Sequence, residues 1–406
     1  MQKFEKHSPV VVTEVTTKHE LRQFMQYPNR LYADNPNYIP SFYGDDLSDW
    51  TPGKNPAFDY CEARCWLARR DGEIVGRIGA ILSHKANDKF GTHRMRFSQV
   101  DFVDDSEVSA ALFGTVERWA REKGCDQVHG PLGFTDMDRE GMLVEGFDRR
   151  SLFFTNYNAP YYLEHLTRLG YRKDVDWIEY RITVPEPGCA EAERLHKLSE
   201  FILKRKHLHV ATVHHKSEYG PFVRQVFELV NAAYAPLYGV VELSDEQIER
   251  YANKFIPLVD PEFVCFVVDE QDQLVAFGVT ALDPSVALKH SDGRLFPFGW
   301  AGVLNDLHHS DTLIMLLTAV RPDLQAEGIN AVMMDHVCQS CNRHGVRFAE
   351  TGPMLELNDH ILAQWKRLEK EQHKRRRCFI KDLDHDVNAA NAAAAQTETP
   401  ETESAE

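Results

Sequence analysis

The sequence contains no long hydrophobic run. No stretch approaches the roughly 18–20 consecutive apolar residues that cross a bilayer, and no secretory signal pattern is present near Met1. We therefore expect a cytoplasmic protein that does not span a membrane.

Positive charge is also scarce. The chain has 46 Lys and Arg against 62 Asp and Glu, a formal net charge of −16. Proteins that bind nucleic acids neutralise phosphates with clustered basic side chains, so this balance argues against a nucleic-acid partner. A basic run at residues 374–377 predicts a solvated strand edge; contact with ligand phosphates or peripheral contact with a membrane surface is the alternative.

The cysteines lack a paired pattern. Eight are spread along the chain without the spacing of a disulfide framework. Cys338 and Cys341 form a C-x-x-C that has no second pair at zinc-ligand spacing, and the histidine pairs lack a spaced third ligand. The sequence predicts free thiols in a reducing compartment and no metal.

Apolar and aromatic residues, at 43% and 11%, are sufficient for hydrophobic cores. Strand and helix signals alternate, and their order at residues 10–185 repeats at residues 207–383. This predicts an α/β fold with a mixed sheet, built of two similar domains joined by a linker and helix at residues 186–206. Residues 1–9 are expected to be flexible, and residues 384–406, poor in large apolar side chains, to be a disordered tail.

The most informative stretch begins with an apolar strand at residues 312–320. A short connection, an amphipathic helix and a strand at residues 346–350 follow. The first N–H groups of a helix have no internal acceptors and carry partial positive charge, and Gly328 lets a ligand approach the backbone. The turn is therefore a candidate phosphate-binding site. After this unit we expect a helix at residues 358–370 and a last strand at residues 376–382.

The pattern V-x-P-x-x-Q-x-x-G-x-x-A at the end of the apolar strand resembles motif A of the GNAT acyltransferase superfamily. In that superfamily the loop holds the pyrophosphate of acyl-CoA, which implies acetyl-CoA or a longer acyl-CoA as the acyl donor. The resemblance implies these cofactor-binding residues: Leu317, Ala319, Val320, Gln325, Ala326, Glu327, Gly328, Ile329, Asn330 and Ala331.

The succession of elements resembles tandem GNAT proteins over residues 10–383. The first-half counterpart of the phosphate loop, residues 102–107, has three carboxylates and no glycine, so we expect acyl-CoA in the second half only. Several segments, among them Gly130-Pro131 and residues 143–147, also resemble a family of uncharacterised bacterial tandem-GNAT proteins. Relatives of that kind have been connected with N-acylation of sphingoid bases by long acyl-CoA.

Candidate catalytic residues follow the phosphate loop. Glu350 ends a strand beside the expected thioester and is a candidate general base; a solvated or salt-bridged carboxylate is the alternative. Asn358 is a candidate for positioning the substrate, or a helix N-cap. The resemblance places Trp365 where many relatives carry a proton-donating Tyr, and an indole N–H is a poor acid.

Candidate substrate-binding residues include Trp365 and three side chains outside this unit. Asp136 and Glu145, in a Gly-, Phe- and Met-rich loop at residues 130–147, are candidates to bind an amine; a solvated covering loop is the alternative. Trp300, in an apolar insertion at residues 295–304, is a candidate to line a hydrocarbon channel; an interface between the halves is the alternative.

The sequence thus predicts an acyl-CoA-dependent N-acyltransferase that acylates a primary amine. The narrower expectation is a long acyl chain and a lipid amine of the sphingoid type. Two alternatives stay open at this point: an aminoacyl-tRNA-dependent peptidyl transferase, which also uses two GNAT-like halves, and a CoA-binding module without catalysis.

Overall fold

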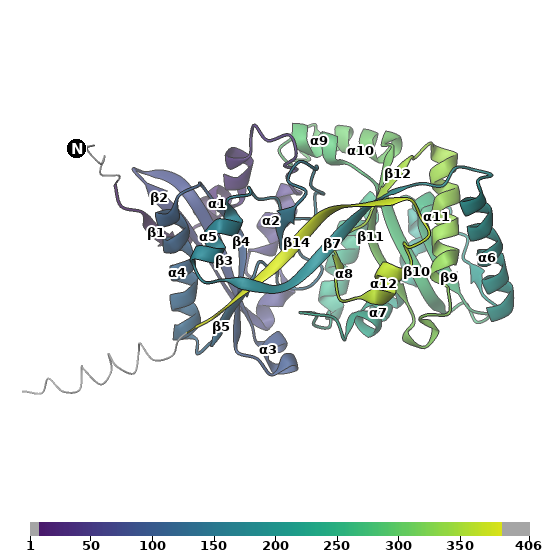
Figure 1. Ribbon diagram of the computed structural model, residues 1–406, viewed down its shortest axis with the longest axis horizontal. Helices are drawn as coiled ribbons and strands as arrows, with labels where there is room; N and C mark the ends of the chain where they lie inside the picture. The colour runs from purple at the N-terminus through teal and green to yellow at the C-terminus, as the bar shows by residue number, and fades with distance from the viewer. Residues whose placement is uncertain (1–7, 384–406) are drawn as a thin grey trace, which may run out of the picture.

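The computed structural model describes residues 8–383, which form one mixed sheet of 14 strands with helices packed against it (Figure 1). The predicted tail at residues 384–406 lies outside the described residues, as does the predicted flexible start except for its last two residues. The predicted α/β class with a mixed sheet and a repeated order of elements is confirmed.

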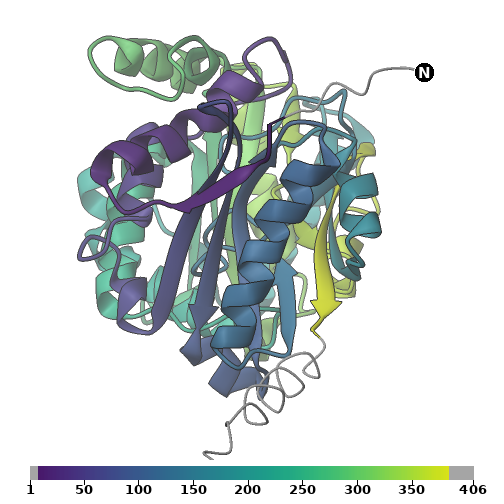
Figure 2. The same cartoon turned by 90° about the vertical axis from the view of Figure 1, so that its left-hand side faces the viewer.

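The first half ends with the long strand β7. Its elements are β1 (Val11–Glu14), α1 (Lys18–Leu31), α2 (Tyr43–Asp49), β2 (Cys61–Arg70), β3 (Glu73–Ser83), α3 (His84–Phe90), β4 (Arg94–Phe102), α4 (Ser106–Glu122), β5 (Gln127–Gly130), β6 (Met142–Glu145), α5 (Tyr162–Arg168) and β7 (Arg172–Thr183). Alternate residues of β2 face opposite sides: Trp66 and Ala68 pack in the core beneath α4, and Cys65 and Leu67 in the core beneath α1. Figure 2 shows α4 lying across this part of the sheet.

The second half begins after a connecting helix. Its elements are α6 (Ala190–Lys206), β8 (His209–Val210), α7 (Gly220–Tyr234), α8 (Asp245–Phe255), β9 (Val264–Val268), β10 (Leu274–Leu282), α9 (Ser285–His290), α10 (Gly299–His309), β11 (Thr312–Val320), α11 (Asn330–His344), β12 (Phe348–Glu350), β13 (Met354–Leu355), α12 (Asp359–Ala363) and β14 (Lys370–Asp382). The predicted helix at residues 358–370 and last strand at 376–382 are wrong in extent, because α12 stops at Ala363 and β14 starts at Lys370. Pairing with β7 along the length of β14 decides its conformation over local helix propensity.

Strands β7 and β14 run through both halves of the sheet. The strand order is β1-β2-β3-β4-β5-β14-β7-β12-β11-β10-β9-β8. The last strand of the chain therefore lies beside β5 of the first half, and β7 of the first half lies beside β12 of the second. Figure 1 shows β7 and β14 as a pair of long strands that run diagonally across the molecule. The predicted domain boundaries at residues 185 and 207 stay a prediction. The strands of the two halves are joined by backbone hydrogen bonds into one continuous sheet.

The sheet opens between β11 and β12. These parallel strands pair over only three positions, from Thr312–Phe348 to Ile314–Glu350, and β11 then continues to Val320 without a partner on that side. A register shift between Val279 and Thr280 of β10 bends β11 at this point. The first half repeats the feature, because β4 pairs with β5 only from Arg94–Gln127 to Arg96–His129.

The basic run at residues 374–377 is not the predicted solvated edge. The Lys374 and Arg376 side chains are fully buried: Lys374 Nζ lies 3.3 Å from a Glu179 carboxylate oxygen, and Arg376 Nε lies 2.5 Å from the other oxygen. Arg377 and Arg375 pair with Asp176 of β7. The run is neutralised by acidic residues of a strand about two hundred positions earlier in the chain, so it offers no basic surface. No helix among residues 8–383 is long and apolar enough to cross a membrane.

Candidate active site

The turn between β11 and α11 has the geometry of an anion cradle. Gly328 has a φ of 83° and Ala326 a φ of 64°, and Gln325 braces the turn by donating its side-chain N–H to the Val320 carbonyl at 3.2 Å. Among residues 8–383, no acceptor is bonded to the backbone N–H groups of Ala326, Gly328, Ile329 and Asn330. These donors converge at the start of a 15-residue helix, where an anion is stabilised.

A cleft of about 800 Å³ lies beside this cradle. Its wall includes three exposed basic side chains, Arg194 of α6 and Lys366 and Arg367 after α12, and within the described chain none of them pairs with a carboxylate. Glu327, in contrast, points to Lys206 at 2.8 Å and does not line the cleft. A chain with a net charge of −16 therefore keeps free cations where a phosphorylated ligand would lie.

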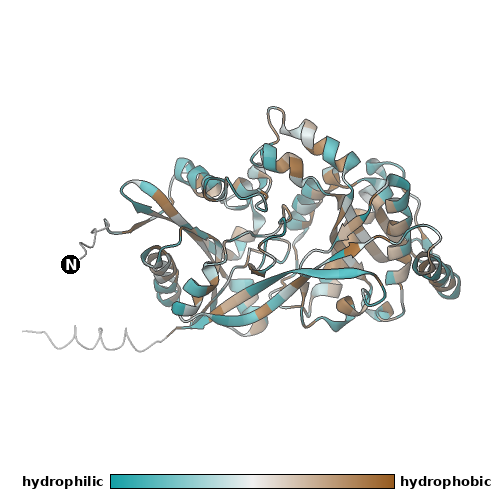
Figure 3. Ribbon diagram, turned by 45° about the horizontal axis from the view of Figure 1, so that its top comes forward, coloured by the Kyte–Doolittle hydropathy of each residue, from teal (hydrophilic) through white to brown (hydrophobic). Residues whose placement is uncertain are grey.

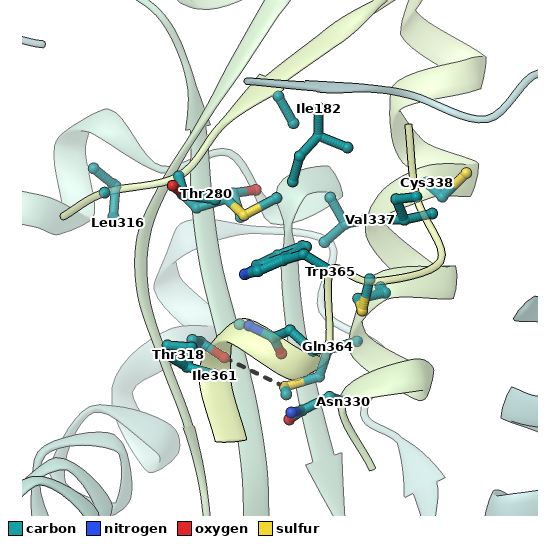
Figure 4. Close-up of a pocket in the computed structure, with 18 of the residues that line it drawn as sticks. Ile182, Thr280, Leu316, Thr318, Asn330, Val337, Cys338, Ile361, Gln364 and Trp365 are labelled. Carbon is teal, nitrogen blue, oxygen red and sulfur yellow. Dashed lines mark hydrogen bonds between the residues drawn. The ribbon is translucent and has the colours of Figure 1, made fainter. Parts of the chain in front are cut away.

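An apolar cavity of about 170 Å³ continues from the cleft into the opening between β11 and β12 (Figure 4). Its wall is formed mainly by β11, α11 and the segment after α12. The residues that line both the cleft and the cavity are Leu195, Tyr234, Thr318, Asn330, Met334, Ile361, Gln364 and Leu368. One passage thus leads from the anion cradle to an apolar interior. Nine of the ten predicted cofactor residues line it; Glu327 is the exception.

Trp365 lies in the wall of the apolar cavity (Figure 4). Its indole is buried and donates to the Met354 sulfur at 3.2 Å. The residue therefore shapes the cavity and has no free polar group for proton transfer. Asn358 lines the cleft and caps α12, because its side-chain oxygen accepts the Ile361 N–H at 3.2 Å.

Tyr234, at the end of α7, stands where the cleft meets the apolar cavity. Its hydroxyl donates to the Thr318 carbonyl at 2.7 Å, on the unpaired side of β11. Burial raises the pKa of this phenol above its ordinary value, with the Asp136 charge as a second cause. Tyr234 is therefore protonated at neutral pH. Sequence reasoning missed it, because no motif links α7 to the phosphate loop.

Glu350 has the ion-paired surroundings that were the alternative to a catalytic role. Its carboxylate lies 3.2 Å from the buried Lys374 Nζ, and the residue lines neither the cleft nor the apolar cavity. A bulge between Gln372 and Lys374 turns both His373 and Lys374 inward. The Lys374 charge thus fixes Glu350 to β14, away from the passage.

The loop before β6 brings a pair of carboxyl groups into the seam between the halves. Burial raises the pKa of Asp136 to about 6, and burial, followed by the Asp136 charge, raises the pKa of Glu140 well above its ordinary value. Within the described residues, Glu140 has no hydrogen-bond or ion-pair partner. The neighbouring Met137 packs against the same hydrophobic core as Leu316 and Leu317 of β11, and the Asp136 charge acts on the pKa of Tyr234. Neither carboxyl group lines the cleft or the apolar cavity. Asp136 was predicted and Glu140 was missed.

Two predicted substrate residues lie elsewhere. Glu145 pairs with Arg375 of β14 at 3.2 Å, which fixes β6 to the sheet. Trp300 of α10 is 47% exposed and lines neither the cleft nor the apolar cavity. Phe296, Phe298, Trp300 and Leu304 of the apolar insertion are exposed, so the hydrocarbon-lined space comes from α11 and β11 instead.

The first-half counterpart of the cradle is closed by its own side chains. Asp105 accepts the N–H groups of Glu107 and Val108 and pairs with Arg70, which also holds Glu107. The donors that would meet a phosphate are already used, and the absence of CoA from the first half stays a prediction.

Comparison with solved structures identifies the fold. Over 92% of this chain and 99% of the other, the structure matches a tandem GNAT protein from the clavulanic acid biosynthesis pathway, with a TM-score of 0.52 and 14% identity. The chain therefore has the tandem GNAT fold, as its element order predicts.

Two curated proteins resemble the sequence itself. Protein YghO of Escherichia coli is 27% identical over 379 residues, covering 92% of this chain and 95% of that protein. The Bacterial ceramide synthase of Caulobacter vibrioides is 28% identical over 298 residues, covering 72% and 75%. No protein-family model matches the sequence.

Proposed function

We propose that this protein is an acyl-CoA-dependent N-acyltransferase whose chemistry takes place at the opening between β11 and β12. The observation that carries the proposal is the single passage that joins unbonded backbone donors and free cations to an apolar cavity. Acyl-CoA has this sequence of properties: phosphates at one end, a polar arm, and an apolar acyl chain. Pyrophosphate at the cradle would place the thioester beside Thr318 and Tyr234.

The reaction needs a deprotonated amine and a protonated leaving group. The amine nitrogen attacks the thioester carbonyl, and a backbone N–H of β11 near Leu317 receives the developing oxyanion. Before the attack, Asp136 takes one proton from the substrate's ammonium group, which gives the nitrogen the lone pair that attacks. The carbon–sulfur bond then breaks as Tyr234 donates a proton to the departing thiolate, the role for which Trp365 is unsuited. The proton that the nitrogen loses as the amide forms restores the Tyr234 phenol. The products are an amide and free CoA.

Replacing Tyr234 with Phe tests this assignment. We expect kcat to fall by about 10- to 100-fold, the scale of a lost general acid, while KM for acyl-CoA changes little. Tyr219→Phe is the matched control, because Tyr219 is also buried, lies at the other end of α7 and lines neither cavity. Equal kcat values for Tyr234→Phe and Tyr219→Phe would show that Tyr234 is not the general acid.

The free cations of the cleft give a second test. Changing both Arg194 and Arg367 to Ala should raise KM for acyl-CoA by about tenfold or more, because two exposed charge contacts to phosphate are lost. The same variant should turn over S-acyl-pantetheine, which has no phosphates, as fast as the wild type does. A matching loss with acyl-pantetheine would show that the arginines act on folding or on the chemistry and not on phosphate.

The apolar cavity favours an acyl chain longer than acetyl. A cavity of about 150 Å³ accepts benzene, so the 170 Å³ found here holds roughly six carbon atoms without rearrangement. Met333 and Met334 lie in its wall, and flexible thioethers can shift to admit a longer chain. A lipid amine of the sphingoid type as the acceptor is supported by the resemblance to a protein named Bacterial ceramide synthase.

The two alternatives make different demands. A partner tRNA needs a basic channel, and the basic run at residues 374–377 is neutralised by acidic residues of β7. A binding module without catalysis would release no thiol.

Measuring thiol release for acetyl-, hexanoyl- and hexadecanoyl-CoA with polar and long-chain primary amines tests the proposal. We expect release only when amine is present, and faster with the longer thioesters; no amine-dependent release would leave the protein a binding module.

A further inference from the structure

The segment from α9 to α10 carries the two most exposed aromatic side chains of the described chain, Phe296 and Phe298. Phe296 is 81% exposed, Phe298 is 80% exposed, and Trp300 at the start of α10 is 47% exposed. They lie within five residues of one another, in the connection between α9 and α10 and at the start of α10, and we call this stretch the tip. Figures 1 and 2 show α9 and α10 as a projection at the top of the molecule. Apolar groups also appear along α10 in Figure 3. Three large aromatic residues at one exposed tip are unusual on a surface that meets only water.

The projection is anchored beside the reaction site. Ala287, Leu288 and Val303 of α9 and α10 pack in one core with Ile314 of β11 and, at its margin, with Leu316 and Phe154. Leu316 lines the apolar cavity at the opening of the sheet. The core that holds the projection therefore contacts the wall of the apolar cavity, where we propose that acyl transfer takes place.

A groove leads inward from the tip. It has a volume of about 1010 Å³ and begins at Arg294, Leu295 and Phe296. Its inner wall shares Phe42, Asp45, Lys254 and Leu258 with a second, narrower pocket of about 100 Å³.

The narrower pocket lies beside the residues that we propose to bind the amine. Met137, Asp138 and Phe154 line it, and Met137 is next to Asp136. The Phe154 ring lies 3.6 Å from the position that a Cβ on Gly352 would occupy, and Gly352 lines the apolar cavity. Phe296 therefore borders the groove, the groove shares wall residues with the narrower pocket, and Phe154 separates that pocket from the apolar cavity.

The charge of the projection fits a neutral interface. Residues 285–309 contain two basic residues, Lys289 and Arg294, and two acidic residues, Asp292 and Asp306, so their formal charges cancel. The chain as a whole has a net charge of −16, and an anionic surface would repel it. A patch that is locally neutral and aromatic enters the headgroup region of a bilayer through apolar burial and not through attraction to anionic lipid.

We propose that Phe296, Phe298 and Trp300 form the surface by which this protein docks to a lipid bilayer, and that the groove beneath them takes the lipid amine from it. The second part rests on the proposed function; the docking surface does not. An amine with a long hydrocarbon chain has a low solubility in water and resides in the membrane. A binding site that contacts the bilayer can take up such an amine directly from it. The acyl-CoA enters by a separate route, through the cleft beside α11, which shares no wall residue with the groove.

Vesicle flotation of the full-length protein tests the docking surface. We expect the wild type to float with phosphatidylcholine vesicles, at least as well as with vesicles that contain phosphatidylglycerol, and with little effect of salt. The double variant Phe296→Ser/Phe298→Ser should lose about tenfold or more in partition, because two apolar anchors are removed. Phe201→Ser is the matched control, since Phe201 is 57% exposed on α6, away from the projection. Equal flotation of the double variant and the wild type, or binding that needs anionic lipid and low salt, would overturn the proposal.

Two further readouts separate docking from catalysis. Brominated phosphatidylcholine should quench the fluorescence of Trp300, so Trp300→Phe should lose the quenched component while still floating. The double variant should acylate a long-chain amine presented in vesicles about tenfold more slowly and a short, soluble amine at the wild-type rate. Loss of both rates would contradict delivery through the groove. Flotation without any acyl transfer would refute the proposed function and leave the docking surface standing.

Discussion

A protein in which Gly328 is replaced by Glu is expected to lose acyl-CoA binding altogether. The residue has a φ of 83°, which strains any side chain, and a new Cβ would lie 3.0 Å from the Ile202 side chain. A carboxylate at this point would also face the unbonded N–H groups and repel the pyrophosphate. Binding is measured by thermal shift, because a ligand stabilises the folded state in proportion to its affinity.

Gly345→Glu supplies the control for this substitution. Gly345 ends the same helix with a φ of 69°, and nothing lies within 4 Å of a Cβ placed there. Both variants therefore gain the same charge and a similar backbone strain, and we expect both to lose stability by a similar amount. Only Gly345→Glu should keep the thermal shift with acyl-CoA. A full shift in Gly328→Glu would show that the cradle is not the phosphate site.

The second large effect is expected at Asp136. Asp136→Asn should lower kcat by about 100-fold or more, because a general base is lost. In the wild type, kcat/KM should rise with pH through about 6, where the pKa of Asp136 lies, and flatten above it. The variant should lose this inflection. Asp148→Asn, an 82% exposed aspartate of the same region, should match the wild type.

The same carboxyl group should reveal itself in stability. Its pKa is about 6 when folded and ordinarily near 4, so the folded state binds the proton more tightly. Protonation of Asp136 therefore makes its full contribution to the free energy of unfolding below about pH 4, and this contribution is lost as the pH rises through 6. Asp136→Asn should therefore melt a few degrees higher than the wild type at pH 8, an effect of about 1 to 2 kcal/mol, and no higher at pH 4. A variant that is inactive and less stable at pH 8 would point to a structural aspartate instead.

The turn between β11 and α11, the candidate phosphate site, was predictable in its conformation because its signals are local. An apolar strand, a Gly at the turn and an amphipathic helix lie within one continuous stretch, and each determines its own conformation. The closed loop of the first half was predictable for the same reason, since Asp105 and Glu107 cap the helix that they begin.

What the sequence could not predict depends on distant pairing. Nothing near residue 374 indicates that Lys374 will meet Glu179 and Glu350 inside the sheet. The basic run was therefore assigned to a solvated edge, and the ion pair of Glu350 was foreseen only as an alternative and without its partner. Strand β14 was assigned too short because its partner lies in the first half. Trp300 shows the same limit: composition gives the apolar character of a segment but not the direction in which it faces.

The central claim is that one chain transfers an acyl group from CoA to an amine. The direct measurement is mass spectrometry of the products formed from carbonyl-labelled hexadecanoyl-CoA and a long-chain primary amino alcohol. We predict an N-acyl amide that carries the label, free CoA in equal amount, and neither product with Gly328→Glu. Labelled free acid would indicate a hydrolase, and unchanged thioester a binding module; either result would contradict the account.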